Sequence, residues 1–481
     1  MWPLPVLWTL ALGLWGLSRQ GSVWRDEAAT WQVARRSTAE ICHLLENVDV
    51  VHGCYYLLMH LLFSCFGAGT TTLRLPSVLA MAVAAGCLAV TGRRLAGARA
   101  GTAAGLALGL LPAVQFHLQE GRPYALVAAG AGVCTLLLVT ALRRPVRARH
   151  WLAYGCALAL AGLLNWLALL IVPAHLATLL LSRAGRGVRI RWTAAAATAT
   201  LCVLPLVLFS RTQSRQVSWI PPLTWHTLVG PAVLLAIAGA CALVARPRTA
   251  RVTPVTVGLP LLVVPHLGLA GLSLVQPLFV DRYILYSLLG LALLVGAAVD
   301  TAARALTRRN PAAARRLLPV VLALATIALL PQSLAKRSPE SRVDDVMAIA
   351  ADVRRVKQPG DAVLFLPAAR RDTQSVSPGS FSGLRDVALR RTPEESGTLK
   401  GVEAGPERIR AALLGHRRVL LVTDAAAVAR PVTAERERVK SSVLSTYFRP
   451  VYDEETRGRR LTVYERLERR PVPGPVGIRA R

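Results

Sequence analysis

The sequence contains too little charge for a soluble protein of its size. Only 17% of its 481 residues are charged, whereas 53% are hydrophobic, and the mean hydropathy is +0.43. Soluble globular proteins carry about 25% charged residues. The apolar residues also come in blocks, and most blocks approach the roughly 20 residues needed to cross the hydrocarbon core of a bilayer. These features exclude a soluble enzyme and predict a mainly α-helical, polytopic membrane protein.

Lysine is almost absent, so the net charge of +30 comes from arginine. A basic excess of this size often indicates nucleic-acid binding. Here, however, many of the arginines lie in short loops between apolar blocks. This pattern is typical of cytoplasmic loops in membrane proteins. We therefore expect a lipid bilayer, and no nucleic acid, among the partners.

Several kinds of site are also missing from the sequence. The eight cysteines include no Cys-x-x-Cys or Cys/His spacing of a structural zinc site. The sequence does allow a disulfide between Cys42 and Cys54. There is no glycine-rich phosphate loop, so we expect no nucleotide cofactor. The first apolar segment, residues 2–17, lacks the basic start and the small-residue cleavage site of a signal peptide. We interpret it as a retained first span.

The loops alternate between arginine-rich and less basic, and this alternation predicts the topology. It is regular only if residues 18–73 do not cross the membrane, which makes the short run 55–66 an interfacial or re-entrant helix. The predicted topology then has about eleven spans, with the N-terminus inside the cell. The predicted cytoplasmic arginines are Arg93, Arg94 and Arg99; Arg143, Arg144, Arg147 and Arg149; Arg183, Arg186, Arg189 and Arg191; Arg246, Arg248 and Arg251; and Arg304, Arg308, Arg309, Arg315 and Arg316.

The predicted domains follow from this topology. Residues 1–332 form a transmembrane domain whose first extracytoplasmic loop is 18–73, residues 333–468 form an extracytoplasmic α/β domain, and 469–481 is a disordered Pro/Gly/Arg-rich tail. We expect the protein in the plasma membrane, with its C-terminal domain outside the cell. In that domain the periodicity predicts helices over 343–356 and 434–445 and strands over 362–366, 418–423, 448–452 and 461–464.

Polar residues at membrane depth gather on the predicted outer side. A carboxylate there could take a proton from an acceptor hydroxyl, and an arginine could hold a phosphate through paired hydrogen bonds. Two carboxylates could share a divalent ion. The candidates are Asp26 and Glu27 after the first span; His52 and Tyr56 on the amphipathic run; Glu120, Arg122 and Tyr124; and Arg282 and Tyr283.

Each candidate also has a purely structural interpretation. Asp26 and Glu27 could belong to a solvated loop or a helix N-cap, because charged residues are common there. Glu120 and Arg122 could pair at a helix end. Arg282 could anchor its span at the interface, where arginine and tyrosine are common.

Four motifs, in this order, resemble the multi-span C-type glycosyltransferase superfamily, and most closely the family of protein O-mannosyltransferases and lipid A aminoarabinose transferases. The first is the Asp26-Glu27 pair. The second is the His-x-x-Tyr-Tyr-Leu-Leu-x-His run at 52–60, with Gly53-Cys54 in place of the family's Pro-Pro. The third is Leu-Arg-Leu-Pro-Ser at 73–77, and the fourth is Gln-Glu-Gly-Arg-Pro-Tyr at 119–124.

The resemblance implies transfer of a sugar, mannose- or arabinose-like, from a polyprenyl-phosphate donor on the outer face of the membrane. The acceptor would be a protein, a glycolipid or a wall polymer. Asp26 matches the family's catalytic acidic position, with Glu27 beside it. Glu120 matches a second acidic position near the lipid phosphate or a divalent metal ion, so Asp26 and Glu120 are candidate metal ligands. The predicted substrate-binding residues are His52, Tyr56, Arg74, Glu120, Arg122, Tyr124, Arg282 and Tyr283.

Two other functions remain open at this stage. A transporter or flippase of lipid-linked sugars should show repeated halves or broken helices with charges at mid-membrane, whereas the charges here lie at one rim. A non-catalytic scaffold would use the exported domain to bind a partner. We expect that domain to bind the acceptor or to cover the site, and we interpret Asp344, Asp345 and Asp361 as helix and turn residues.

Overall fold

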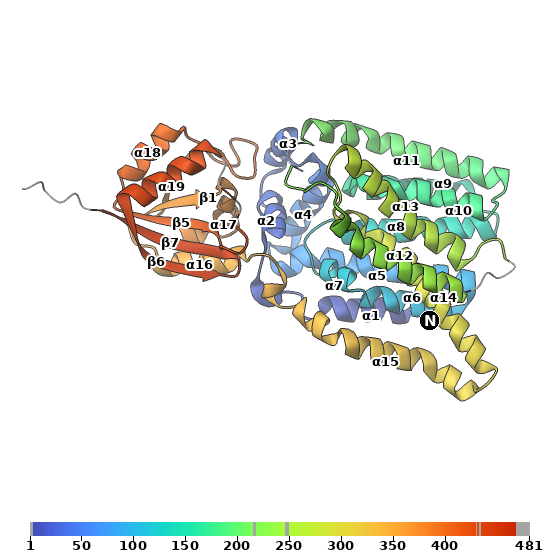
Figure 1. Ribbon diagram of the computed structural model, residues 1–481. Coiled ribbons are helices and arrows are strands. Elements are labelled where there is room, and N and C mark those ends of the chain that lie inside the picture. The colour runs from blue at the N-terminus through green and yellow to red at the C-terminus, as the bar shows by residue number, and fades with distance from the viewer. Residues whose placement is uncertain (1–2, 215–217, 246–249, 430, 432–433, 468–481) are drawn as a thin grey trace, which may run out of the picture. The chain divides into compact units, whose positions relative to one another are not determined.

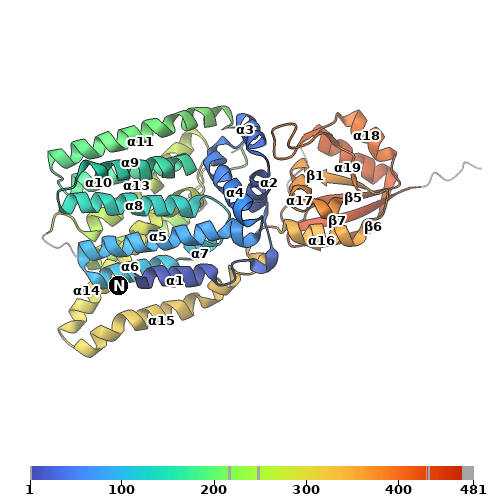
Figure 2. The same ribbon diagram turned by 180° about the vertical axis from the view of Figure 1, so that it is seen from behind.

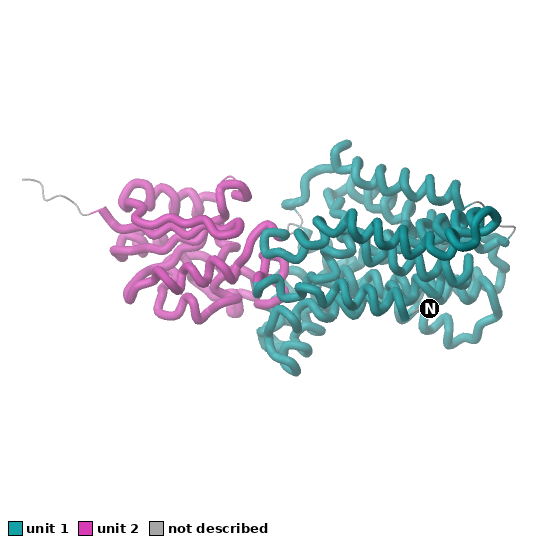
Figure 3. Tube along the Cα trace, turned by 90° about the horizontal axis from the view of Figure 1, so that it is seen from below, with its two compact units in different colours: residues 1–21, 33–341 teal, residues 22–32, 342–481 magenta. Residues whose placement is uncertain are grey.

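The computed structural model describes residues 3–214, 218–245, 250–429, 431 and 434–467. Arg246 and Arg248 of one predicted cytoplasmic loop, and the predicted disordered tail 469–481, lie outside the described residues. The chain divides into two compact units, shown in Figure 3. The first comprises residues 1–21 and 33–341, and the second comprises 22–32 and 342–481. The division falls at 341 rather than 332, and the segment that carries Asp26 and Glu27 groups with the C-terminal residues.

The first unit is a bundle of long apolar helices (Figures 1 and 2). Eleven apolar segments of the described chain are helical. They are α1 (Pro3–Leu14), α5 (Thr70–Ala96), α6 (Ala98–Leu110) with α7 (Pro112–Leu118), α8 (Tyr124–Arg143), α9 (Ala148–Leu164), η3 (Trp166–Leu170) with α10 (Ile171–Leu181), α11 (Arg186–Thr212), α12 (Trp225–Ala245), α13 (Pro254–Val275), η5 (Asp281–Ser287) with α14 (Leu288–Thr307), and α15 (Pro311–Ala335).

Among the described residues, seven helices are long and apolar enough to cross a membrane, or eight if a bent pair forms one span. The others are short or broken. α1 has only 12 residues, and α6 and α7 meet at an angle of 67° before Pro112. α9 ends at Leu164, and the side chain of the next residue, Asn165, accepts a hydrogen bond of 3.0 Å from the Leu167 N–H. The polytopic helical fold is confirmed, while the count of eleven spans and their orientation stay predictions.

Small residues let the central helices approach closely. A Cβ on Gly101 of α6 would lie 2.1 Å from the Ala89 carbonyl oxygen of α5, and one on Gly290 of α14 would lie 2.4 Å from the Gly258 oxygen of α13. Helices in lipid associate through this kind of close packing because the hydrophobic effect gives little drive there. α14 is consequently buried in the bundle, whereas α12 and α15 keep most of their apolar side chains on the surface.

The first loop carries short helices, as predicted. α2 spans Arg25–Ala34, α3 spans Thr38–Asn47, η2 spans Val50–His52 and α4 spans Gly53–Phe66. A Ser37–Glu40 capping box begins α3. α4 has 14 residues, too few to cross a bilayer, and runs across one end of the bundle (Figures 1 and 2). The eight cysteines all lie in the described part of the chain and are unpaired, Cys42 and Cys54 included.

The second unit contains a five-stranded mixed sheet in the order β2-β1-β5-β7-β6. The strands β1, β5 and β2 are parallel, and β5, β7 and β6 are antiparallel. A two-stranded sheet pairs β3 with β4. The strands are β1 (Ala362–Leu366), β2 (Arg385–Asp386), β3 (Leu389–Arg391), β4 (Val402–Glu403), β5 (Arg418–Asp424), β6 (Phe448–Thr456) and β7 (Arg459–Arg466).

Helices cover both faces of this sheet. Because side chains alternate along a strand, Ala362 and Leu364 pack with α18 (Pro406–Leu414) and α19 (Glu435–Tyr447), whereas Val363 and Phe365 pack with α16 (Val346–Val356). A strand covered on both faces is apolar throughout, which explains why this run was predicted from the sequence. The predicted C-terminal α/β domain is therefore confirmed.

Candidate active site

The first loop holds a partly buried carboxylate that the sequence interpretation missed. Asp49 adopts a left-handed backbone conformation, with φ of 62°, just before η2. Its Oδ1 accepts a hydrogen bond of 2.7 Å from His52 Nδ1, and its Oδ2 accepts one from the Tyr56 hydroxyl. His52 and Tyr56 lie one helical turn apart, so both face the same carboxylate. The three- and seven-residue spacings from Asp49 are the signal that could have identified it.

The charges around this carboxylate keep it ionised. Burial raises the pKa of Asp49, but the charge and hydrogen bond of His52, the charge of Arg122 and the bond from Tyr56 together hold that pKa below its ordinary value. Burial, followed by the negative charge of Asp49, raises the pKa of Tyr56. At neutral pH the pair is thus a carboxylate and a neutral phenol. Because Arg122 acts on both groups, the 119–124 segment lies close to the first loop.

The 119–124 segment is fixed by the helices around it. Glu120 is 1% exposed and its carboxylate accepts a hydrogen bond from His117 Nδ1. Its backbone carbonyl accepts one of 2.6 Å from the Ser77 hydroxyl on α5. A Cβ on Gly121 would lie 2.4 Å from Leu73 Cγ, so only glycine fits without a shift. The third and fourth motifs of the sequence, residues 73–77 and 119–124, therefore pack against each other.

Arg282 lies among three aromatic rings. Its guanidinium carbon is 5.8 Å from the centre of the Tyr124 ring, 5.6 Å from Trp219 and 6.0 Å from Tyr283. Rings at such distances stabilise the cation and orient its plane. The Tyr124 ring also contacts those of His117 and Tyr283. Trp219 was not a sequence candidate, because a lone tryptophan in a loop carries no signal of this kind.

These contacts join three segments that are far apart in the sequence. Residues 49–56, 117–124 and 281–283 all belong to the first unit. Nine side chains of these segments form one cluster: two carboxylates, two arginines, two histidines and three tyrosines. The predicted members are His52, Tyr56, Glu120, Arg122, Tyr124, Arg282 and Tyr283. We call this set, with Asp49 and His117, the rim cluster.

Arg74 contacts the chain segment that follows α1. It is fully buried on α5, and its Nη1 donates hydrogen bonds of 2.9 and 2.8 Å to the carbonyls of Leu17 and Ser18. These carbonyls belong to the segment that follows α1. The observed bonds hold the chain where it leaves the first helix, and the predicted contact of Arg74 with substrate stays a prediction.

Asp26 and Glu27 form the first turn of α2 and belong to the second unit. Glu27 is fully buried and Asp26 is half-buried. Asp26 and Glu120, the predicted metal ligands, are thus in different units. Across the described part of the chain, no three His, Cys, Asp or Glu side chains could hold one metal ion. Binding of a metal ion by Asp26 and Glu120 stays a prediction.

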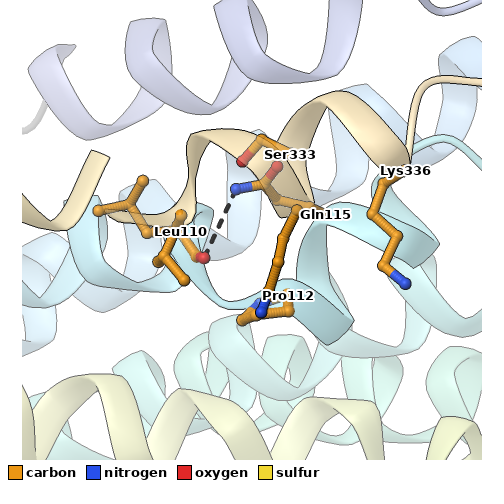
Figure 4. Close-up of a pocket in the computed structure, with 7 residues that line it drawn as sticks. Leu110, Pro112, Gln115, Ser333 and Lys336 are labelled. Atoms are coloured by element: carbon orange, nitrogen blue, oxygen red, sulfur yellow. Dashed lines mark hydrogen bonds between the residues drawn. The ribbon is translucent and has the colours of Figure 1, made fainter. Parts of the chain in front are cut away.

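Two hollows lie outside the rim cluster. The cleft in Figure 4, between α6, α7 and α15, has no room for a water molecule and is lined by Leu110, Gln115 and Lys336 among others. This is small for a ligand pocket, which usually measures about 300–1,000 Å³. A groove of about 620 Å³ between α9 and α11 is lined mainly by apolar and small residues, with Arg147 and Arg191. Neither is lined by a residue of the rim cluster.

Comparison with known proteins supports the predicted resemblance. Residues 54–209 match the family model described as dolichyl-phosphate-mannose-protein mannosyltransferase. No curated protein sequence matches the chain significantly. The matched range contains α5 and the 119–124 segment, and thus the third and fourth motifs. It begins within the second motif, so His52 and Gly53 lie outside it.

Solved structures share the fold. ArnT from Cupriavidus metallidurans aligns with a TM-score of 0.61 in its apo state and 0.62 when bound to undecaprenyl phosphate, at 13% and 12% identity. The alignments cover 96% of this chain and 97% of ArnT. The archaeal oligosaccharyltransferase AglB from Archaeoglobus fulgidus, in complex with an inhibitory peptide and a dolichol-phosphate, gives 0.53 at 10% identity, over 87% of this chain and 69% of AglB. The predicted resemblance to the C-type glycosyltransferase superfamily is therefore confirmed.

Proposed function

We propose that this protein is a multi-pass membrane glycosyltransferase that takes its sugar from a polyprenyl-phosphate donor. The observation that carries the proposal is the rim cluster itself, in a chain whose fold aligns with ArnT over nearly its whole length. The cluster joins buried acidic groups to arginines that can bind phosphate. ArnT has been solved with undecaprenyl phosphate and AglB with a dolichol-phosphate, and both lipids carry the same kind of headgroup.

The arginines would bind the donor phosphate. Guanidinium groups pair with phosphate oxygens through two parallel hydrogen bonds, and they are weakly enough hydrated to do so beside lipid. Arg282 is oriented by three rings, and Arg122 is part of a network with Asp49 and Tyr56. As the bond between the sugar and the phosphate breaks, negative charge grows on the phosphate, and these cations would stabilise it.

The transfer itself would be a single displacement. An acceptor oxygen or nitrogen forms a bond to the anomeric carbon of the sugar, the bond from that carbon to the phosphate oxygen breaks, and the configuration inverts. The acceptor loses a proton, for which we propose the Asp26 carboxylate as the base, by its match to the family's acidic position. Glu27 would support it from the same helical turn. No step of this proposal uses a metal ion.

Purified protein tests this function directly. It should convert a polyprenyl-phosphate-linked mannose or arabinose to free polyprenyl phosphate only when an acceptor is present. Vesicles that carry the protein and translocate the lipid-linked sugar without consuming it would favour a flippase instead. We further propose that the reaction takes place on the outer face of the plasma membrane. Mass spectrometry of the glycans of a deletion strain would identify the sugar and tell whether the acceptor is a protein, a glycolipid or a wall polymer.

A further inference from the structure

The N-terminal end of α2 is held by carboxylates of the C-terminal domain. Residues 22–32 and 342–481 form one compact unit, although more than 300 residues separate them in the chain. Arg25 is the first residue of α2 and directly precedes Asp26 and Glu27. Whatever fixes Arg25 therefore fixes the helical turn on which the proposed catalytic residues lie.

Asp344 binds Arg25 twice. Its Oδ1 accepts a hydrogen bond of 2.9 Å from the Arg25 backbone N–H, and its Oδ2 accepts one of 2.9 Å from Arg25 Nε. Asp424 adds a third bond, of 3.3 Å, to Arg25 Nη2. The first N–H groups of a helix have no partner within the helix, and carboxylates there stabilise it. Asp344 acts as the N-terminal cap of α2, supplied from a distant part of the chain.

The residues before Arg25 are fixed in the same way. The Val23 N–H donates a hydrogen bond of 3.3 Å to Asp345 Oδ1, and the Val346 N–H donates one of 2.8 Å to the Val23 carbonyl. Asp345 also caps α16 by accepting from the Met347 and Ala348 N–H groups. A single carboxylate thus connects the start of α16 to the chain that leads into α2.

Asp344 is itself rigidly supported. Arg459 is fully buried and contacts Asp344 Oδ2 through Nε at 3.0 Å and Nη2 at 2.9 Å. Asp372 accepts two bonds of 2.8 Å from the same guanidinium. Burial raises the pKa of Asp344, but the charges of Arg459 and Arg25 hold it below the ordinary value, so the carboxylate is ionised at neutral pH. Ion pairs thus connect Arg25 to Asp344, Asp344 to Arg459, and Arg459 to Asp372.

We propose that the C-terminal domain positions the catalytic turn of α2, and that Asp344 and Asp424 are the positioning residues. This inference rests on the proposed role of Asp26 in sugar transfer. It assigns the domain a function that needs no contact with the acceptor. In the sequence, Asp344 looks like an ordinary residue before a helix. The structure explains why it is an aspartate, because its two oxygens accept hydrogen bonds from one backbone N–H and two guanidinium groups.

The test compares Arg25→Gln, Asp344→Asn and the double variant in the purified full-length protein. Removing either partner should free the same turn, so the amides of residues 23–28 should exchange with deuterium about tenfold faster. Displacement of a reacting group lowers kcat, and we expect a loss of roughly a hundredfold with KM for the donor changed less than about threefold. The double variant should be no worse than either single variant, because the two residues act as a pair.

Two further variants separate positioning from general stability. Asp361→Asn breaks another ion pair of the same domain, the partly buried Asp361–Arg418 pair. Its oxygen and nitrogen lie 2.7 Å apart, at the other end of strands β1 and β5. It should leave exchange at 23–28 and kcat near those of the wild type. Arg25→Lys keeps the charge and should recover part of kcat.

The outcomes are distinct. If Asp344→Asn speeds exchange at 23–28 no more than Asp361→Asn does, or if exchange rises while kcat stays at the wild-type value, the positioning role is wrong. If the wild type transfers no sugar, the proposed function fails, and the exchange data alone still decide whether Asp344 fixes this turn.

Discussion

The Asp49 carboxylate and the His52 imidazole lie 2.7 Å apart at the start of the juxtamembrane helix α4, with side-chain exposures of only 15% and 12%. The pair stands where the related family often has a His-Pro-Pro sequence, whereas this chain has His52-Gly53-Cys54. Two prolines would restrict the backbone at this helix start. Here the side-chain pair, together with Tyr56, fixes the position of His52.

Replacement of Asp49 should therefore destabilise the protein in a pH-dependent way. Because its pKa in the folded protein lies below the ordinary 3.8, the carboxylate stabilises the fold above about pH 4, and this contribution is lost as the pH falls further. At pH 7, Asp49→Asn should cost about 1–3 kcal/mol, as expected when a buried charged partner is lost. Thermal unfolding in detergent between pH 3 and 7 measures the difference from the wild type, which should shrink below about pH 4.

Glu46→Gln provides the matched control on the same loop. Its side chain is 74% exposed and lies 3.7 Å from His43. Exposed pairs contribute little, so this change should cost less than about 0.5 kcal/mol at any pH. An Asp49→Asn variant as stable at pH 7 as Glu46→Gln would contradict the role assigned to the Asp49–His52 pair.

Arg282→Lys should weaken binding of the donor more than it slows the chemical step. Lysine keeps the charge but loses the planar group that lies among the rings of Tyr124, Trp219 and Tyr283. We expect KM for the polyprenyl-phosphate sugar to rise about tenfold, which corresponds to about 1.4 kcal/mol. Initial rates at varied donor concentration measure this. Arg186→Lys, at an exposed arginine on α11, is the control and should leave KM unchanged.

The predicted orientation can be tested with a native cysteine. Cys42 is exposed on α3, in the loop predicted to lie outside. A membrane-impermeant maleimide should label it in intact cells. A cysteine introduced as Arg186→Cys, in a loop predicted to be cytoplasmic, should react only after permeabilisation. The opposite pattern would reverse the topology and place the rim cluster on the cytoplasmic side.

The sequence predicted the parts of the fold that have strong periodicity. The apolar blocks became helices, and the run at 362–366 became β1 because a strand buried on both faces is apolar throughout. β2 and β4 have two residues each, and β3 has three, too few for any period to appear. These strands pair with residues that are distant in the sequence, so a local sequence pattern cannot predict them.

The site was predicted where a motif marks it, and missed where only the fold brings residues together. Glu120 and Arg122 stood out because charge is rare in an apolar chain. Asp49 looked like one more loop residue, although it binds His52 and Tyr56. Asp345, interpreted from the sequence as a helix or turn residue, caps α16. The contact between Asp344 and Arg25 spans 319 residues, so only the structure could reveal it.

Asp26→Asn tests the central claim most directly. The purified variant should fold like the wild type, with the same melting temperature to within a few degrees, and should release no polyprenyl phosphate from the sugar donor, because asparagine cannot accept the acceptor's proton. Glu27→Gln, one residue further on the same turn, should retain measurable transfer. If Asp26→Asn transferred sugar at the wild-type rate, Asp26 would not be the base, and the catalytic assignment would be wrong.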